Sequence, residues 1–378
     1  MNPTLEPLWD ISPTLANALQ QCWLRVAYSR DPALNRLRRP TDRTALGTAA
    51  HALTEKAWKG ELSGSGTPDE ESLGAAWDQV VEQQQQRLAA AWAPAVPPAP
   101  PHWPGYALTR ARLLRRLLPV VAQATPSTPP VNAASAHSVQ MPALPWVERR
   151  LKDGSTGLIG TPDRVEQRSE QVVVVDFKSG VHQEEMTPAQ ELQLLLYAHL
   201  VQVARGALPQ VAVVLDGAGK ERVLQIDPPS VAGAVAGVTA LRDRYNAALV
   251  GATTASMAAP GPDVCRGCPY RPVCRPFAEH WSEDWKVGRG VWGVLQTQST
   301  HAGAWEIEVL AQAPLELKGS LVRVTGLVAA IPAAPGDEVA VVRTDVLGDP
   351  HVLRSRWSTL LWPMPPAPAV GVGSSSES

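Results

Sequence analysis

One stretch of the sequence limits the possible folds more than any other: two acidic residues and a lysine around a run of four valines. A Pro-Asp pair ending at Asp163 is followed, after twelve residues, by Asp176, Phe177 and Lys178. The sequence predicts three strands in a meander, Trp146–Lys152, Thr156–Gln167 and Gln171–Phe177. The run Val172–Val175 predicts that the last strand is buried, and it is expected to fold antiparallel onto the strand before it. Because alternate residues of a strand share a face, Asp176 and Lys178 point the same way and Phe177 points into the core. This pairing predicts that Asp163 lies beside Asp176.

Two carboxylates held side by side repel each other, and a bound divalent cation usually neutralises this repulsion. Carboxylate oxygens are hard ligands that suit Mg²⁺ or Mn²⁺. A lysine on the same patch can orient a metal-bound water and offset the negative charge of a transition state. The combination predicts metal-assisted hydrolysis of a phosphodiester bond. An Asp-x-Lys pair alone is also common on exposed strands, so the upstream Pro-Asp carries much of the argument.

The pattern resembles the PD-(D/E)XK nuclease superfamily, in particular its RecB-like branch. That branch includes the AddB nuclease domain and the CRISPR-associated single-strand exonucleases. The resemblance covers roughly residues 10–280. It implies an α/β fold with a restriction-endonuclease-like nuclease core and a helical N-terminal part. It also implies that Asp163, Asp176 and the backbone carbonyl of Phe177 bind the metal, and that Lys178 positions or activates the water.

Two further residues match the metal-binding part of that branch. Gly47 and His51 fit the Gly-x-x-x-His of an early helix, where the histidine would bind metal and the glycine would let the helix pack close to the sheet. A capping or surface histidine is the alternative. Glu148 stands where the family places an acid on the strand before the Pro-Asp. We expect it behind the metal ligands, and a solvated strand residue is the alternative.

A helix after the lysine completes the pattern, and a capping box of Thr187 and Gln190 predicts where it begins. Gln193 and Tyr197 match the family's Gln-x-x-x-Tyr, and their spacing puts both polar ends on one face of the helix. We expect them to hydrogen-bond the scissile phosphate, Lys178 or the end of a strand. The leucines between and around them indicate that the other face of this helix packs in the core.

Four cysteines form a separate pattern. Cys265, Cys268 and Cys274 stand within ten residues in a proline-rich loop. Cys22 lies more than 240 residues earlier, on the first predicted helix, which is expected over Pro13–Tyr28. In a cytoplasmic protein this grouping indicates a metal site rather than disulfides. It resembles the RecB-like subgroup in which a 4Fe–4S cluster ties the two ends of the nuclease domain together. Zinc held by the same four thiolates and four unrelated buried cysteines are the alternatives.

Composition shifts divide the chain into parts. Residues 1–283 are the expected nuclease domain, with proline-rich insertions near 94–104 and 124–145. Short apolar segments between turn signals over residues 288–362 predict a small, OB-like β-barrel, and an SH3-like barrel fits the same pattern. Residues 363–378 are rich in Pro, Gly and Ser and are expected to form a disordered tail.

Basic and aromatic residues suggest two places that grip single-stranded DNA. The first, on a predicted helix and the loop before it, comprises Trp103, Tyr106, Arg110, Arg112, Arg115 and Arg116. The second, in the predicted barrel, comprises Trp292, Trp305, Arg323 and Arg343. A solvated basic face explains the first group nearly as well, and a protein-docking module is the alternative for the barrel.

Charge and hydropathy exclude several classes of protein. The net charge of −2 excludes a globally basic coat for nucleic acid, so any contact must come from local patches. No apolar run approaches the ~18 residues that span a bilayer, so no membrane partner is expected. The N-terminus shows no basic start followed by an apolar stretch, and we expect a cytoplasmic location. The chain contains no Walker-type phosphate loop and therefore no ATP motor of its own.

Together these features predict a Mg²⁺- or Mn²⁺-dependent deoxyribonuclease. We expect an exonuclease that acts on single-stranded DNA ends in repair or recombination, with a helicase or another repair protein as partner. One alternative is a DNA-binding or helicase-associated scaffold with a four-cysteine metal staple and little cleavage. Intact Asp163, Asp176 and Lys178 count against it. Another is a CRISPR-adaptation nuclease, and the insertions and the C-terminal barrel count against that.

Overall fold

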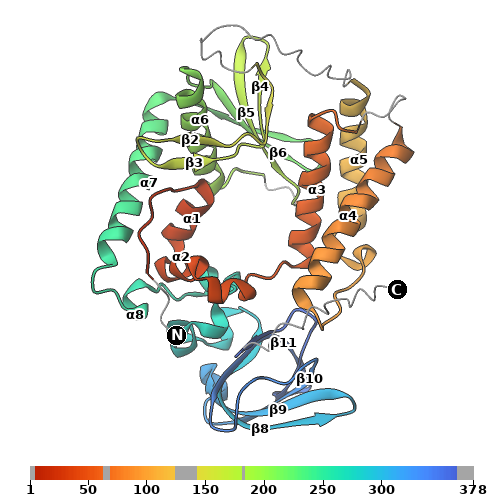
Figure 1. Cartoon of the computed structure of the whole chain (residues 1–378), viewed down its shortest axis with the longest axis vertical. Coiled ribbons are helices and arrows are strands. Elements are labelled where there is room, and N and C mark those ends of the chain that lie inside the picture. Colours follow the sequence, from red (N-terminus) through yellow and green to blue (C-terminus); the bar gives the residue numbers. More distant parts are fainter. Residues whose placement is uncertain (1–4, 63–68, 124–142, 181–183, 364–378) are drawn as a thin grey trace, which may run out of the picture.

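The structure of the protein is a computed structural model with an α/β architecture (Figure 1). It describes residues 5–62, 69–123, 143–180 and 184–363. Most of the insertion expected at 124–145 and nearly all of the expected tail lie outside the described residues. A five-stranded sheet with helices on both faces forms the upper part in Figure 1, and a second sheet forms the lower part.

The N-terminal part is helical, as predicted. Its helical segments are α1 (Pro13–Gln21), α2 (Trp23–Arg30), η1 (Pro32–Leu37), α3 (Asp42–Trp58), α4 (Glu70–Trp92), η2 (Pro100–His102) and α5 (Tyr106–Gln123). One helix was expected over Pro13–Tyr28, but two are present. Cys22 has an extended backbone (φ −164°, ψ 116°) and is both the C-cap of α1 and the N-cap of α2. The break sets Cys22 apart from the regular helical face.

The central sheet has the order β1-β4-β5-β6-β7. Its strands are β1 (Trp146–Val147), β4 (Arg164–Arg168), β5 (Gln171–Lys178), β6 (Val211–Asp216) and β7 (Glu221–Gln225). The antiparallel pairing of β4 with β5 is present as predicted. Strands β5 and β6 are parallel and are joined by the crossover helix α6 (Pro188–Arg205). Strand β5 is therefore the middle strand of the sheet.

Two strands that the sequence predicted as continuous are broken. The segment Trp146–Lys152 separates into β1 and β2 (Leu151–Asp153), because Glu148 has a left-handed backbone (φ 49°). The segment Thr156–Gln167 separates into β3 (Leu158–Gly160) and β4, with Pro162, which cannot donate to a strand ladder, at the break. Strands β2 and β3 pair only with each other. Both breaks leave an acidic residue at the end of a strand.

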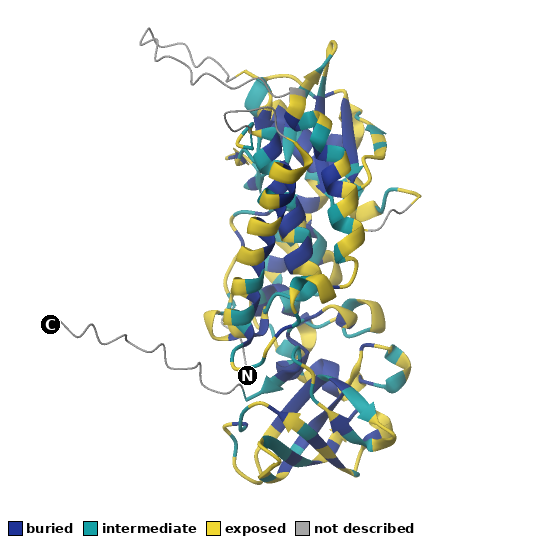
Figure 2. Ribbon diagram, turned by 90° about the vertical axis from the view of Figure 1, so that its right-hand side faces the viewer, coloured by how far each residue is buried: buried dark blue, intermediate teal, exposed yellow. Residues whose placement is uncertain are grey.

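The two faces of the sheet pack against different helices, and Figure 2 shows the buried residues running through the sheet. Val174 belongs to the cluster formed with α1, α6 and α7 (Pro228–Ala248). Val173 and Val175 lie on the opposite face with Trp58 of α3. Phe177 shares that second face and belongs to the cluster of α3, α4 and α5. The alternation of β5 therefore puts Asp176 and Lys178 on the face opposite to Phe177, as predicted, and this face is the one covered by α6.

Short helical segments then lead to the second sheet. They are α8 (Thr254–Met257), α9 (Pro262–Arg266), η3 (Arg271–Val273), α10 (Arg275–His280) and η4 (Glu283–Trp285). The strands that follow are β8 (Arg289–His301), β9 (Ala304–Ala313), β10 (Leu321–Leu327), β11 (Glu338–Leu347), β12 (Asp349–Arg354) and β13 (Leu360–Trp362), with η5 (Leu315–Leu317) after β9. None of the helices in the described residues is long and apolar enough to cross a membrane.

The second sheet contains the short strands that the sequence predicted. Its order is β12-β10-β9-β8-β11-β13, and β12 pairs additionally with β11. This arrangement by itself does not assign the sheet to the OB-like class, which stays a prediction. Trp292, Val342 and Leu360 of this sheet share a buried cluster with Phe277 and Trp281, which precede it. The two parts of the molecule therefore have a common core.

Candidate functional site

Three strand ends meet at one edge of the central sheet. Asp163 directly precedes β4, and continuing the β4–β5 register by one residue places it opposite Asp176. Its Oδ2 accepts a hydrogen bond from the backbone N–H of Phe177 at 2.5 Å. Glu148 directly follows β1, and its backbone N–H donates to the carbonyl of Asp163 at 3.1 Å. The sheet ladder therefore brings Glu148, Asp163 and the end of β5 together.

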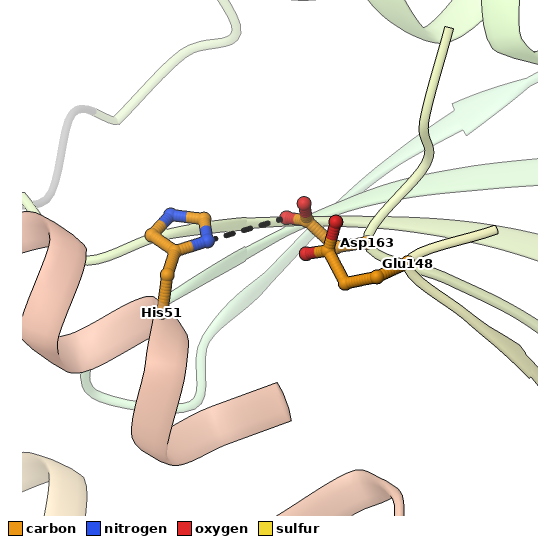
Figure 3. A group of neighbouring side chains, drawn as sticks. All are labelled: His51, Glu148 and Asp163. Atoms are coloured by element: carbon orange, nitrogen blue, oxygen red, sulfur yellow. Dashed lines mark ion pairs between the residues drawn. The ribbon is translucent and has the colours of Figure 1, made fainter. Parts of the chain in front are cut away.

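Helix α3 adds a histidine to this edge. Nδ1 of His51 lies 3.9 Å from Oδ2 of Asp163. One ligand atom from each of His51, Glu148 and Asp163 lies within 4.8 Å of the other two, and Figure 3 shows the imidazole facing both carboxylates. The imidazole ring also packs on Phe177, with 4.9 Å between ring centroids. The structure thus brings together an imidazole and two carboxylates from three separate elements.

Asp176 forms a second cluster on the face covered by α6. Its side chain is 2 % exposed, and its Oδ2 lies 2.8 Å from Nζ of Lys178. Nε2 of Gln193 donates to Oδ1 of Asp176 at 3.0 Å and lies 3.1 Å from the hydroxyl of Tyr197. Nζ of Lys178 donates to Oε1 of Gln193 at 3.3 Å. The predicted acid, lysine, glutamine and tyrosine therefore form one connected network.

Burial disfavours the charged forms of these groups. Burial, together with the charge of Asp163, raises the pKa of Glu148 to about 7. Burial likewise raises the pKa of Asp176 to about 6, against the lowering effect of Lys178, and raises the pKa of Asp163. Burial and then the charge of Lys178 lower the pKa of His51, which favours a neutral imidazole. A divalent cation would stabilise the ionised carboxylates and accept the lone pair of the imidazole.

A comparison with protein families adds an independent result. The profile of the PD-(D/E)XK nuclease superfamily matches residues 10–275. The chain belongs to this superfamily. The match runs from the first helix through the acid–lysine cluster to the last cysteine, and members of the superfamily are metal-dependent nucleases. A search of curated proteins found no match.

Glycine lets α6 approach the PD-(D/E)XK centre closely. Thr187 and Gln190 form a capping box that begins α6, as predicted. A Cβ atom on Gly160 would come within 2.8 Å of the side chains of Tyr197 and Leu200. Only glycine therefore allows β3 and α6 to pack at this distance. The same packing fixes the position of Tyr197 relative to the network of Asp176, Lys178 and Gln193.

Helix α3 packs closely at the glycine that the sequence indicated. A Cβ on Gly47 would lie 3.3 Å from Oγ of Ser179, just beyond β5. That distance is tight for a Cβ contact, although the serine side chain can rotate. It supports the prediction that this glycine allows close packing of α3, which carries His51, on the sheet.

Arg116 is a positioning residue that the sequence analysis grouped with DNA-contacting arginines. Its guanidinium lies over the ring of Phe177, 4.3 Å from the centroid, and donates to Oγ1 of Thr54 at 2.7 Å. It therefore supports Phe177 from the side opposite the carboxylates, and the N–H of Phe177 binds Asp163. The available sequence signal was helical spacing, because Arg116 follows Leu113 by three residues and so shares its face of the helix. Leu113 is buried in the structure.

Two of the tryptophans expected to grip DNA are buried, whereas Arg112 and Arg115 of the first group are exposed. Trp103 is 2 % exposed, and its Nε1 donates to the carbonyl of Pro98. Trp292 is 5 % exposed, and its Nε1 donates to Glu338. The expectation that these indoles stack on bases is therefore wrong, because both are core residues. Arg323 pairs with Glu308 at 3.1 Å.

The four cysteines meet at a site away from the carboxylates. All four have free thiols and line one small cavity between α2 and the segment from α8 to η3. All are described, and no three of their Sγ atoms lie within 4.8 Å of one another. Burial raises the pKa of the Cys268 thiol to about 11 and also raises that of Cys265 and Cys274.

Neighbouring side chains hold the cysteine loop in place. The hydroxyl of Tyr28 donates to the carbonyl of Val273 at 3.2 Å, and its ring lies 5.6 Å from that of Tyr270. The buried Arg271 donates to the carbonyl of Cys268 at 3.3 Å and also to the carbonyl of Val287. The loop is thereby joined to the first helices and to the start of the second sheet.

Proposed function

We propose that the protein is a metal-dependent deoxyribonuclease that removes nucleotides from single-stranded DNA ends. The observation that carries the proposal is the meeting of His51, Glu148 and Asp163 beside the Asp176–Lys178 pair. One buried and two partly buried carboxyls with raised pKa values, together with a neutral imidazole, are a donor set that suits Mg²⁺ or Mn²⁺.

The metal would be held where the strand ends meet. His51, Asp163, Asp176 and the carbonyl of Phe177 are the ligands that the family resemblance implies. We add Glu148, since its carboxylate lies within 4.8 Å of the ligand atoms of His51 and Asp163. When bound, the cation supplies Lewis-acid activation of the phosphate and lowers the pKa of a water. The Asp176 carboxylate is 2 % exposed, and its Oδ2 lies 2.8 Å from Nζ of Lys178, so a metal bound there would lie beside the lysine.

The lysine network would act on the phosphate and the attacking water. Nζ of Lys178 orients the water and stabilises the charge that develops on the phosphate oxygens. Gln193 bonds both Asp176 and Lys178, so it fixes their relative position. Tyr197 holds Gln193 from the next turn of α6. These contacts place the ammonium group of Lys178 and the amide of Gln193 on one side of the carboxylates.

We also propose that the four cysteines hold a 4Fe–4S cluster. The support is the grouping of three neighbouring cysteines with a distant fourth, which the family resemblance associates with such a cluster, and the small cavity that all four cysteines line. A cluster supplies four bonds that join Cys22 to the loop of Cys265, Cys268 and Cys274. Its role would be that of a structural staple.

We assign the protein to the RecB-like branch, with a role in DNA repair or recombination and a cytoplasmic location. The support comes from the Gly47–His51 pattern, the Gln193–Tyr197 pair and the cysteine spacing. A helicase partner would supply the ATP-driven strand separation for which the sequence shows no motif. The pairing of β12 with both β10 and β11 supports the predicted small barrel.

Cleavage of end-labelled DNA tests the proposal. Anaerobically purified protein is incubated with Mn²⁺ and with linear single strands, duplexes and circular single strands. We expect short products from linear single strands, slower loss of duplex and no cutting of circles. Chelation of the divalent metal stops the reaction. Cutting of circular single strands would contradict exonuclease action, and intact DNA in every arm would contradict the nuclease assignment.

Replacement of His51 gives a direct measure of metal binding. We expect His51→Ala to weaken Mn²⁺ affinity at least about ten-fold, because one of the nitrogen and oxygen ligands is lost. Isothermal calorimetry on the DNA-free protein measures it. His199→Gln is the matched control, because His199 is also partly buried but pairs with Asp153 at 2.8 Å. Unchanged Mn²⁺ affinity in His51→Ala would exclude the histidine as a ligand.

A further inference from the structure

A cavity at the junction between the nuclease core and the second sheet is separate from the carboxylate centre. Its volume is about 620 Å³, within the range of about 300–1,000 Å³ that is typical of ligand sites. Its walls come from the connector between η1 and α3, the end of α4, and the segments that follow β10 and β12. Figure 1 shows the connector running from the region of α2 to the lower end of α3.

The lining combines guanidinium groups with indole rings. Four arginines contribute to it: Arg36, Arg38, Arg39 and Arg356. Among the described residues that line the cavity, none is acidic, although Arg356 pairs with Asp345 just outside it. Burial first, and then the neighbouring charge of Arg36, lower the pKa of Arg39. The cavity is therefore complementary to an anion.

The aromatic part of the lining is held rigidly. Trp357 is partly exposed and meets the buried Trp92 edge to face, with 5.4 Å between ring centroids. Nε1 of Trp92 donates to the carbonyl of Pro40 at 2.7 Å, and the guanidinium of Arg39 lies 4.9 Å from its ring centroid. An indole beside several arginines is the combination that binds a base and its phosphates in single-stranded DNA.

The cavity is also tied to the helix of the metal centre. Pro40 directly precedes Thr41, the N-cap of α3. The ten residues from Thr41 to His51 rise about 15 Å along the helix axis, which is the reach of a few nucleotides. A DNA strand bound at the cavity would therefore lie next to the helix that carries His51.

We propose that this junction cavity is a second binding site for single-stranded DNA, in which Trp357 stacks on a base and the arginines bind the flanking phosphates. The proposal rests on the proposed nuclease function for the kind of ligand, but it concerns binding alone. It gives the second sheet a role in holding the substrate strand. The residues of that sheet that the sequence pattern indicated for DNA binding are different ones: Trp292, Trp305, Arg323 and Arg343.

Binding to labelled dT₂₀ and dT₄ without divalent metal tests the proposal on the full-length protein by fluorescence anisotropy. We expect Trp357→Ala to weaken dT₂₀ binding about ten-fold, from the loss of one base stack, with Trp357→Phe retaining most of the affinity. The double variant Arg38→Gln/Arg39→Gln should reduce the slope of log K against log salt by about 1.4, or about 0.7 for each phosphate contact. Binding of dT₄, which is too short to reach both sites, should weaken much less in the catalytic cluster variant Lys178→Met than in Trp357→Ala.

Two controls and a separate assay distinguish the outcomes. Trp9→Ala removes a tryptophan that is 79 % exposed, and Arg244→Gln removes an exposed arginine of α7, so neither should change dT₂₀ affinity. Wild-type affinity and salt slope in both the Trp357→Ala and the double arginine variant would overturn the proposal. If Trp357→Ala does not fold, the salt slope of the double variant decides. DNA cleavage measured separately tests the nuclease function, which stands or fails independently of this site.

Discussion

Asp176→Asn is expected to reduce DNA cleavage at least about a thousand-fold while the protein stays folded, because removal of one charged group from such a centre costs that much or more. The substitution keeps the side-chain volume and the contact with Gln193 but removes the charge that faces Lys178. Single-turnover cleavage of end-labelled single strands measures the rate, and circular dichroism checks the fold.

Two companion variants separate metal binding from the chemical step. Lys178→Met should lose a similar factor in rate yet keep its affinity for Mn²⁺, because the lysine is expected to act on the water and the phosphate. Asp163→Asn should lose both. Asp153→Asn is the control: this buried carboxylate binds Ser155, Thr156 and His199 near the sheet. It should lower stability but leave the rate per folded molecule unchanged. Near-normal turnover in Asp176→Asn would refute the site.

Cys22→Ser is expected to release the metal from the cysteine site and to lower the melting temperature by about 5–10 °C. The physical reason is that ligation and folding are coupled in such sites. A bond from Cys22 to the loop of Cys265 closes more than 240 residues, and a cross-link of that kind stabilises by about 3–5 kcal/mol. Elemental analysis of anaerobically prepared protein measures the metal, with about four iron atoms per chain expected in the unsubstituted protein.

The matched control weakens the same helix without removing a ligand. Ser12 caps α1 by accepting a hydrogen bond from the N–H of Leu15, and Ser12→Ala should cost about 1 kcal/mol. It should retain its full iron content. One zinc and no iron in the unsubstituted protein would replace the cluster with a zinc site. Full metal content in Cys22→Ser would refute the grouping of three cysteines with a distant fourth.

Local patterns in the sequence were enough for the superfamily and for much of the central sheet. The valine run, the spacing from Asp163 to Asp176 and the Asp-x-Lys pair predicted the β4–β5 pairing, because alternation and register follow directly from strand geometry. The capping box at Thr187 likewise predicted where α6 begins. In each case the determining contacts lie within a few residues or between adjacent strands.

Tertiary structure decided which side chains meet. Glu148 joined His51 and Asp163 because a left-handed residue ends β1 at the level of Asp163, and no local signal marks that conformation. Arg116 turned inward beneath Phe177, whereas the sequence pattern placed it with exposed arginines. Trp292 became a core residue since the second sheet packs on α10 and the nuclease helices. The backbone already sets the periodicity of a strand or helix, so the sequence pattern predicts it. Where a side chain points between distant segments depends on how those segments pack, and residue type and spacing do not determine that packing.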